Sequence, residues 1–251
     1  MNSTSKNKVV LITGAARRIG AAITQKFHDH DYNVIVHCND SLQEADQLAG
    51  QLNQSRPNSA AVVQANLTLN QDVSALVSQA LQAFGRVDVV INNASTFYPT
   101  PLAEVSSADW DKLIDSNLRG AFFLCQGLAD TLREHHGAIV NLLDIYAEQP
   151  LKNHPVYSIA KAGLSAMTRS LAMELAPEVR VNGVAPGAIL WPAQDKGTNA
   201  TMMQETILAS VPLGRTGAPE DIAEAVYFLA VQASYVTGEV IRVDGGRRLN
   251  L

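Results

Sequence analysis

Short runs of apolar and β-branched residues alternate along the chain with longer stretches in which apolar residues recur every three to four positions. The short runs are typical of strands buried on both faces, and the longer stretches are typical of amphipathic helices. The pattern predicts seven strands, at Val9–Ile12, Asn33–His37, Ala60–Gln64, Val87–Ile91, Ala138–Leu143, Arg180–Val184 and Glu239–Val243. Because helices alternate with strands and no linker or repeat interrupts them, we predict a single-domain α/β fold. Its core is a doubly wound parallel sheet with helices on both faces.

Several residues mark where the predicted helices begin and end. Ser41 and Glu44 have the spacing of a capping box at the start of one helix. Pro219, followed by two acidic residues, marks the start of another, and Pro177 marks an end because proline cannot continue a helix. The longest apolar periodicity predicts a long helical stretch from about Ala108 to His135.

Composition and charge narrow the classes of function. Of 251 residues, 47% are hydrophobic and 17% charged, which is typical of a compact globular protein. The net charge of -5 argues against nucleic acid as the main partner. No apolar run approaches the roughly 20 residues of a membrane span, and residues 1–7 are polar, so we expect a flexible N-terminal tail, no membrane association and a cytoplasmic protein. Cys38 and Cys125 are isolated, and we expect neither a disulfide nor a metal site.

A glycine-containing turn, Thr13–Gly20, joins the first strand to the first helix. Gly14 permits a tight turn and Gly20 permits close packing of the helix start, while the free N–H groups of that helix suit a pyrophosphate. Strand, glycine turn and helix in this order predict a Rossmann-like dinucleotide site. Ligands of such sheets bind at the carboxyl ends of the strands, where Asn66, Leu67 and the segment Asn92–Ser95 also lie.

Tyr157 and Lys161 are four residues apart, so a helix places them on one face, and Asp144 ends the fifth strand just upstream. A lysine beside a phenol favours the phenolate, and this predicts a lowered pKa for Tyr157 and a role in proton transfer. Taken alone, such a pair is more often a pair of surface neighbours, and Asp144 is equally suited to capping a helix. The glycine turn upstream favours the catalytic interpretation.

At this point the chain resembles the short-chain dehydrogenase/reductase family over nearly its whole length. The resemblance rests on the Gly14–Gly20 turn, Asn92-Asn93-Ala94, Asn117, Tyr157-x-x-x-Lys161 and Pro186-Gly187. It implies a nicotinamide dinucleotide, hydride transfer and a homotetramer. Catalytic residues would be Asp144, Tyr157, Lys161 and Asn117, the last kinking its helix and holding a water that leads to Lys161. Cofactor contacts would come from Gly14, Arg17, Arg18, Ile19, Gly20, His37, Asn39, Ser41, Asn66, Leu67, Asn93, Ala94, Ser95, Tyr157, Lys161, Pro186, Gly187 and Ile189.

Two departures from the family pattern point to a subgroup. Arg18 stands where the family turn usually has glycine, and Asp144 stands where the family usually has serine, thirteen residues before the tyrosine. This combination is similar to that of pteridine reductases and implies a small pterin substrate. A carboxyl group suits protonation near an amidine-like ring nitrogen, whereas a hydroxyl suits a ketone oxygen. The resemblance also places Arg18, Ser95, Phe97, Asp144, Tyr157 and Trp191 against the substrate, and it makes the loop near residues 186–200 the substrate loop.

The second strand ends in His37, Cys38 and Asn39, without the acid that binds the ribose 2′-hydroxyl in NAD enzymes. Arg17 and Ser41 suit a 2′-phosphate, so we predict NADPH, although Asp40 nearby counts against it.

Several alternatives stay open. A carbonyl reductase acting on a 3-oxoacyl thioester is the second enzyme hypothesis, and a dinucleotide-sensing module without catalysis is the third. The proton donor is Tyr157, Asp144 or a water. Phe97 either stacks on substrate or fills space as a core aromatic, and Trp191 either closes over substrate or covers the loop base. Arg247 and Arg248 are either a solvated tail or, as the resemblance implies, approach a neighbouring subunit's site.

Overall fold

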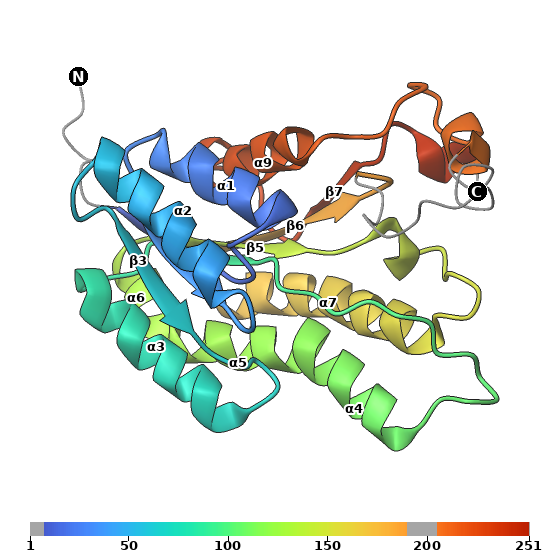
Figure 1. Cartoon of the computed structure of the whole chain (residues 1–251), viewed down its shortest axis with the longest axis horizontal. Helices are drawn as coiled ribbons and strands as arrows, with labels where there is room; N and C mark the ends of the chain where they lie inside the picture. The colour runs from blue at the N-terminus through green and yellow to red at the C-terminus, as the bar shows by residue number, and fades with distance from the viewer. Residues whose placement is uncertain (1–7, 190–204, 251) are drawn as a thin grey trace.

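The computed structural model describes residues 8–189 and 205–250. Seven parallel strands form one sheet, as predicted from the sequence (Figure 1), and their order is β3-β2-β1-β4-β5-β6-β7. The strands are β1 (Val9–Ile12), β2 (Asn33–Cys38), β3 (Ala60–Gln64), β4 (Val89–Asn92), β5 (Ala138–Leu142), β6 (Arg180–Pro186) and β7 (Val240–Val243). Every predicted strand is confirmed, with ends that differ by at most two residues. The central strands are buried throughout because both faces of the sheet are covered.

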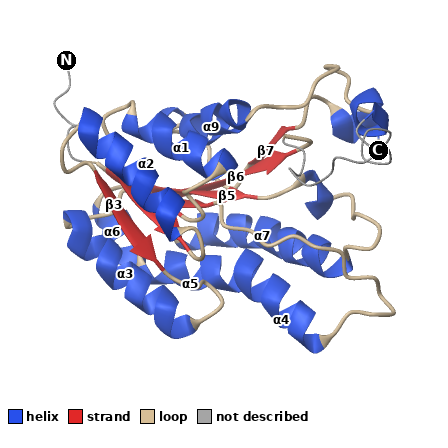
Figure 2. Ribbon diagram, viewed as in Figure 1, coloured by secondary structure: helices blue, strands red, loops and turns tan. Residues whose placement is uncertain are grey.

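Helices cover the two faces of the sheet as separate layers (Figure 2). One layer holds α1 (Arg18–His28), α2 (Leu42–Ser55) and α9 (Pro219–Tyr227). The other holds α3 (Asn70–Phe84), α4 (Ser107–Ile114), α5 (Gly120–Gly127), α6 (Ala129–Glu134) and α7 (Pro155–Glu174). Alternate residues of β1 enter the two hydrophobic clusters, Val10 and Ile12 on one side and Val9 and Leu11 on the other. The sheet is therefore the central layer of a three-layer molecule.

The helical stretch predicted over residues 108–135 is present, and it is divided into α4, α5 and α6. After α4 the chain forms a π-helical turn at Asp115–Arg119, and Leu128 then separates α5 from α6. Asn117 lies in the π turn, and its Nδ2 donates to the carbonyl oxygens of Leu113 and Thr96, at 2.9 Å each. A side chain bonded to the backbone of its own helix competes with the regular helical pattern, which accounts for the change of winding.

The capping box predicted at Ser41 and Glu44 is also absent, since the Ser41 side chain makes no capping bond. Glu44 instead forms an ion pair with Arg17 of the glycine turn, with Nε and Oε1 3.4 Å apart. The carboxylate thus reaches out of its own helix toward the site.

Strand order reverses between β1 and β4, because the chain first adds β2 and β3 on one side of β1 and then crosses to the other. In open α/β sheets this reversal leaves a crevice at the carboxyl ends of the strands. The candidate site lies there. Within residues 8–189 and 205–250, no helix has both the length and the apolar composition needed to cross a membrane.

Candidate active site

The ends of β1 and β4 are joined by a network around Thr13. Its Oγ1 accepts hydrogen bonds from the backbone N–H groups of Asn93 and Ala94, at 2.9 and 3.0 Å. The Asn93 side chain donates in return to the carbonyl oxygens of Thr13 and Gly14, at 2.8 and 2.9 Å. Gly14 has φ +61°, and a Cβ there would lie 3.0 Å from the Ala94 Cα. A Cβ on Gly20 would lie 2.1 Å from the Gly14 oxygen, so this turn requires glycine at both positions.

Helix α1 starts at the cavity with Arg18, whose φ of +52° lies in the left-handed region. Glycine adopts this conformation freely, whereas for another residue the conformation costs roughly 1–2 kcal/mol of free energy. Among the described residues, no side chain caps the helix and its first turn has no acid. The first N–H groups of α1 therefore offer a binding site for an anion such as a pyrophosphate.

His37 holds the glycine turn through a hydrogen bond with the backbone of Gly14. The Gly14 N–H donates to its Nδ1 at 3.2 Å, and its Nε2 lies 3.1 Å from the Ala65 carbonyl oxygen. Burial lowers the pKa of His37 to about 4, so the ring is neutral, with Nε2–H donating to Ala65. Both ring nitrogens are engaged by the backbone. The predicted contact between His37 and the cofactor stays a prediction, and with both ring nitrogens engaged it would be a van der Waals contact, not a hydrogen bond.

Two neighbouring cavities, of about 440 and 560 Å³, run along this edge of the sheet. They share five lining residues, Gly14, Arg17, Ser41, Ala94 and Ser95. The first continues to Arg18, Ile19, Gly20, Asn93, Asp144, Tyr157, Lys161, Pro186, Gly187 and Ile189, and the second continues to His37, Asn39, Asp40, Asn66 and Leu67. Every residue that the sequence assigns to cofactor binding thus lines one of these cavities. An uncapped helix start, a glycine cradle and this elongated space fit a dinucleotide.

Tyr157 and Asp144 form the polar centre of the first cavity. The Tyr157 hydroxyl donates to Asp144 Oδ2 at 2.8 Å, while Asp144 Oδ1 accepts from the Tyr146 N–H at 3.0 Å. Asp144 therefore caps the short 3-10 turn Ile145–Ala147 with one oxygen and holds the phenol with the other. Lys161, only 2% exposed, donates from Nζ to the Leu142 carbonyl oxygen at 2.9 Å.

The pKa of Tyr157 changes in the direction opposite to our expectation. Burial, followed by the negative charge of Asp144, raises the pKa of Tyr157 well above its ordinary value. Burial also raises the pKa of Asp144, and it lowers that of Lys161 to about 8. The prediction that Lys161 lowers the pKa of Tyr157 is wrong for this arrangement, because the ammonium is turned to a backbone carbonyl and the phenol faces a carboxylate. Burial thus shifts both members of the Tyr157–Asp144 pair toward their protonated forms, and the negative charge of an ionised Asp144 adds to this shift for Tyr157.

Asn117 acts on the cavity through Ser95. The Ser95 hydroxyl donates to Asn117 Oδ1 at 2.6 Å, and Asn117 is itself buried. The side chain is not part of either cavity lining, so the described structure connects Asn117 to the site through the hydrogen bond to Ser95.

Phe97 is 52% exposed, which excludes its interpretation as a core aromatic. One of its contacts is stacked, with His154 at 4.6 Å between ring centroids and 7° between planes, and another is edge-on, with Tyr157 at 4.8 Å. No motif in the sequence points to His154. Its position directly before Pro155, three residues ahead of Tyr157, is the signal that it lies beside that tyrosine. Trp191 and most of the loop near residues 186–200 lie outside the described residues. Within the described residues, no cluster of three or more histidine, cysteine or acidic side chains is placed to hold a metal.

Comparisons with known proteins identify the family. Residues 14–248 match the family model described as Enoyl-(Acyl carrier protein) reductase. The chain is 38% identical to pteridine reductase 1 of Leishmania tarentolae, with 99% of each chain covered. It is 36% identical to the 3-oxoacyl-(acyl-carrier-protein) reductase FabG of Thermotoga maritima, with 96% of this chain and 98% of the relative covered. A crystal structure of the short-chain dehydrogenase/reductase SDR:Glucose/ribitol dehydrogenase from Brucella melitensis superimposes with a TM-score of 0.86 at 34% identity, covering 96% of this chain and 97% of that one. The chain therefore belongs to the short-chain dehydrogenase/reductase family of oxidoreductases, whose members use NAD(H) or NADP(H).

Proposed function

We propose that the protein is an NADPH-dependent pteridine reductase that converts 7,8-dihydropterins to 5,6,7,8-tetrahydropterins. The observation that carries this proposal is the 2.8 Å hydrogen bond from Tyr157 to Asp144 at the wall of the first cavity. A carboxyl group there suits a ring nitrogen that needs a proton. The same cavity is lined by Arg18, which suits the oxygen or N5 side of a pterin. The relative named pteridine reductase 1, at 38% identity, supports this choice of substrate.

The reaction adds a hydride to C6 and a proton to N5, and these two additions saturate the C=N bond. The reduced nicotinamide, when bound, supplies the hydride. The chain's own part is the proton, which comes from Tyr157, Asp144 or a water held by them. Burial raises the pKa of both Tyr157 and Asp144, which favours the protonated form of each group, and a proton donor must be protonated when the reaction occurs. Solvent then replaces the proton that was transferred.

Phe97 offers a flat apolar surface beside Tyr157. Aromatic side chains bind planar ring systems by stacking, and the exposure of Phe97 leaves surface for such a contact. The pterin would lie against this ring, with Ser95 and Arg18 at its polar edges.

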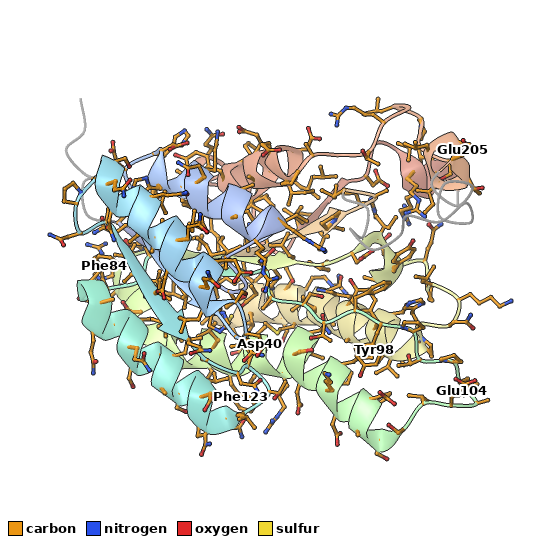
Figure 3. The ribbon with its side chains drawn as sticks, viewed as in Figure 1. Asp40, Phe84, Tyr98, Glu104, Phe123 and Glu205 are labelled. Carbon is orange, nitrogen blue, oxygen red and sulfur yellow. The ribbon has the colours of Figure 1, made fainter. Side chains whose placement is uncertain are left out.

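The preference for NADPH rests on the residues around the second cavity. Arg17 is largely exposed and its ion pair with Glu44 is 3.4 Å long. Such exposed pairs contribute little, so Arg17 is available for the 2′-phosphate, together with Ser41. Asp40 also lines this cavity and is the feature that counts against a phosphate (Figure 3). Comparing KM for NADPH and NADH tests this point, and a lower KM for NADH would contradict it.

A 3-oxoacyl-thioester reductase is the second candidate, favoured by the Thermotoga maritima relative and by the family model. In that reaction the Tyr157 hydroxyl would donate to a carbonyl oxygen. NADPH oxidation with dihydrobiopterin and with an acetoacetyl thioester, measured side by side, separates the two. Faster turnover of the thioester would overturn the pterin proposal. Cofactor binding without turnover of either substrate would favour a dinucleotide-sensing module.

We also propose a homotetramer, in keeping with the family resemblance. Large apolar side chains are exposed on the outer helices, among them Trp110 on α4, Phe122 on α5 and Met173 on α7. Burial of such side chains between subunits would remove apolar surface from water. Light scattering of the purified protein measures the assembly, and a monomer would contradict this proposal.

A further inference from the structure

The last segment of the described chain returns to the loop that carries Asp144. Strand β7 ends at Val243, and two glycines with positive φ, Gly245 and Gly246, turn the chain. Asp244 fixes this turn by accepting from the N–H groups of Gly246 and Arg248, at 2.9 Å each. The turn leads directly into the short helix Arg247–Asn250.

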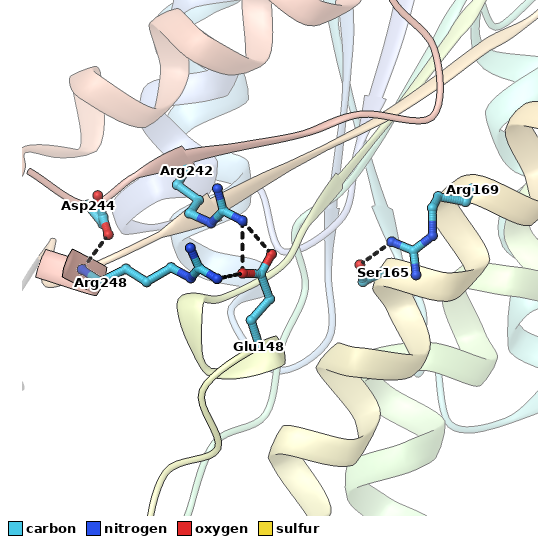
Figure 4. A network of polar contacts seen from close by, with 6 residues as sticks. All are labelled: Glu148, Ser165, Arg169, Arg242, Asp244 and Arg248. Carbon is cyan, nitrogen blue, oxygen red and sulfur yellow. Dashed lines mark hydrogen bonds and ion pairs between the residues drawn. The ribbon is translucent and has the colours of Figure 1, made fainter. Parts of the chain in front are cut away.

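Arg247 and Arg248 reach different residues of the Asp144 loop. Arg248 and Arg242 pair with Glu148, at 2.7 and 2.8 Å, on the outside of the molecule (Figure 4). Arg247 points inward, is only 8% exposed, and donates from Nη2 to the Tyr146 hydroxyl at 3.1 Å. Its guanidinium also lies 5.7 Å from the centre of the Tyr146 ring, a distance typical of a cation–π contact.

These contacts connect Arg247 to the catalytic pair in two steps. Tyr146 holds Asp144 through its backbone N–H, and Asp144 holds the Tyr157 hydroxyl. The charged or titratable groups that act on Asp144 are Tyr157 and Lys161 from α7, Tyr146 from its own loop and Arg247 from the C-terminal segment.

Packing alone does not account for an arginine at position 247. Its Nε is buried and has no hydrogen-bond partner among the described residues; the Arg248 Nε shares this condition, but only Arg247 is buried as a whole residue. A buried polar atom without a partner costs free energy, and an unbranched apolar side chain of similar length would fill the space without that cost. The advantage of the guanidinium must therefore lie in its charge and in its contact with Tyr146.

We propose that Arg247 is a positioning residue for the reductase reaction, one that holds Tyr146 and, through it, keeps the Asp144 carboxyl facing Tyr157. This inference rests on the proposed function of Asp144. It adds that the C-terminal segment of the same chain completes the site. The alternative considered from the sequence, that Arg247 belongs to a solvated tail, does not apply to this buried side chain.

The test is Arg247→Met, which keeps most of the side-chain length and removes the charge. The readout is the dependence of kcat/KM on pH with dihydrobiopterin and NADPH. The reference is the limb of this pH profile that reports the ionisation of Asp144, which is identified because it disappears in Asp144→Asn. Removing a nearby positive charge raises the pKa of Asp144, so we expect that limb to move to higher pH. This direction holds whether the protonated or the ionised carboxyl is the active form.

Two further variants separate positioning from structure. Arg247→Lys restores the charge and is expected to return the limb toward its wild-type position. Arg248→Met is the matched control, because the same substitution one residue later breaks only the exposed pair with Glu148. It is expected to leave the limb unchanged. If Arg247→Met does not fold, Tyr146→Phe removes only the accepting hydroxyl and is expected to move the limb in the same direction, since the guanidinium is no longer held against the loop.

A wild-type pH profile in Arg247→Met would overturn the inference, as would an equal shift in Arg248→Met. A failure of the proposed function is distinguished from a failure of this inference by Asp144→Asn. If the proposed function is wrong, Asp144→Asn turns over dihydrobiopterin at the wild-type rate.

Discussion

Asp144→Asn removes the transferable proton while keeping the shape of the site. The amide oxygen of asparagine can still accept from the Tyr146 N–H, which lies 3.0 Å from Asp144 Oδ1. The amide NH₂ would take the place of Oδ2, and the Tyr157 hydroxyl would change from donor to acceptor. The cap of the 3-10 turn therefore survives, and the protonation pair is lost.

The expected magnitude follows from the kind of catalysis that is removed. General acid–base catalysis contributes typically about 100- to 10,000-fold to a rate. This corresponds to about 3–5 kcal/mol in the activation barrier, at roughly 1.4 kcal/mol for each factor of ten. We expect the loss in kcat, with the dissociation constant of NADPH unchanged within about threefold, since Asp144 bonds to Tyr157 and Tyr146 and not to the glycine turn.

The assay is NADPH oxidation with dihydrobiopterin, combined with a fluorescence titration of NADPH. Asp109→Asn is the matched control, because Asp109 also accepts a hydrogen bond from a tyrosine hydroxyl, that of Tyr98 at 3.2 Å, but lies outside both cavity linings. We expect its turnover to match wild type. Wild-type turnover in Asp144→Asn, or an equal loss in Asp109→Asn, would refute the assignment of the carboxyl.

Three further predictions use other residues of the site. Arg18→Gly relieves a left-handed residue, so in urea unfolding we expect about 1 kcal/mol more stability, together with a higher KM for dihydropterin; lower stability would contradict the strain argument. Burial lowers the pKa of Lys161 to about 8, so the unfolded chain binds the extra proton between pH 8 and about 10.5. The free energy of unfolding should therefore rise across that window, by up to about 3 kcal/mol relative to Lys161→Met, as measured by urea unfolding. His154→Leu loses the stacked contact with Phe97 and should raise the pterin KM up to about tenfold, whereas His154→Phe should restore the stacked contact and the wild-type KM. Equal KM values in both variants would exclude a stacking role.

The strands were predictable because their sequence pattern and their environment coincide. Val9–Ile12 is apolar at every position and is completely buried, as expected for a central strand covered on both faces. Strand ends depend on hydrogen bonds to neighbouring strands, which the apolar pattern does not encode. This explains why the strand expected over Val87–Ile91 begins at Val89 and ends at Asn92.

The interruptions of the long helix were not predictable in the same way. The apolar stripe continues through Asn117 and Leu128, because the helical segments before and after each break still pack on the same side of the sheet. What changes the winding is the pair of bonds from the Asn117 side chain, one to Leu113 of its own helix and one to Thr96 in a separate loop. A contact between distant segments has no periodicity in the sequence, although the identity of Asn117 gave a hint through the family resemblance.

The Tyr157–Asp144 pair shows why spacing predicts proximity better than it predicts charge. The positions of Asp144, Tyr157 and Lys161 in the chain were sufficient to bring them to one cavity. Burial raises the pKa of Tyr157 whichever neighbour the hydroxyl faces, and the carboxylate of Asp144 raises it further. The Lys161 ammonium donates a hydrogen bond to the Leu142 carbonyl oxygen, and the Tyr157 hydroxyl donates to Asp144. A carboxyl in place of the usual serine adds a negative charge that, after burial, raises the pKa of Tyr157 and helps it to hold its proton. A buried phenol beside a buried carboxyl, both with raised pKa values, is suited to delivering a proton to a ring nitrogen, and this is the physical reason behind our proposal of a pterin substrate.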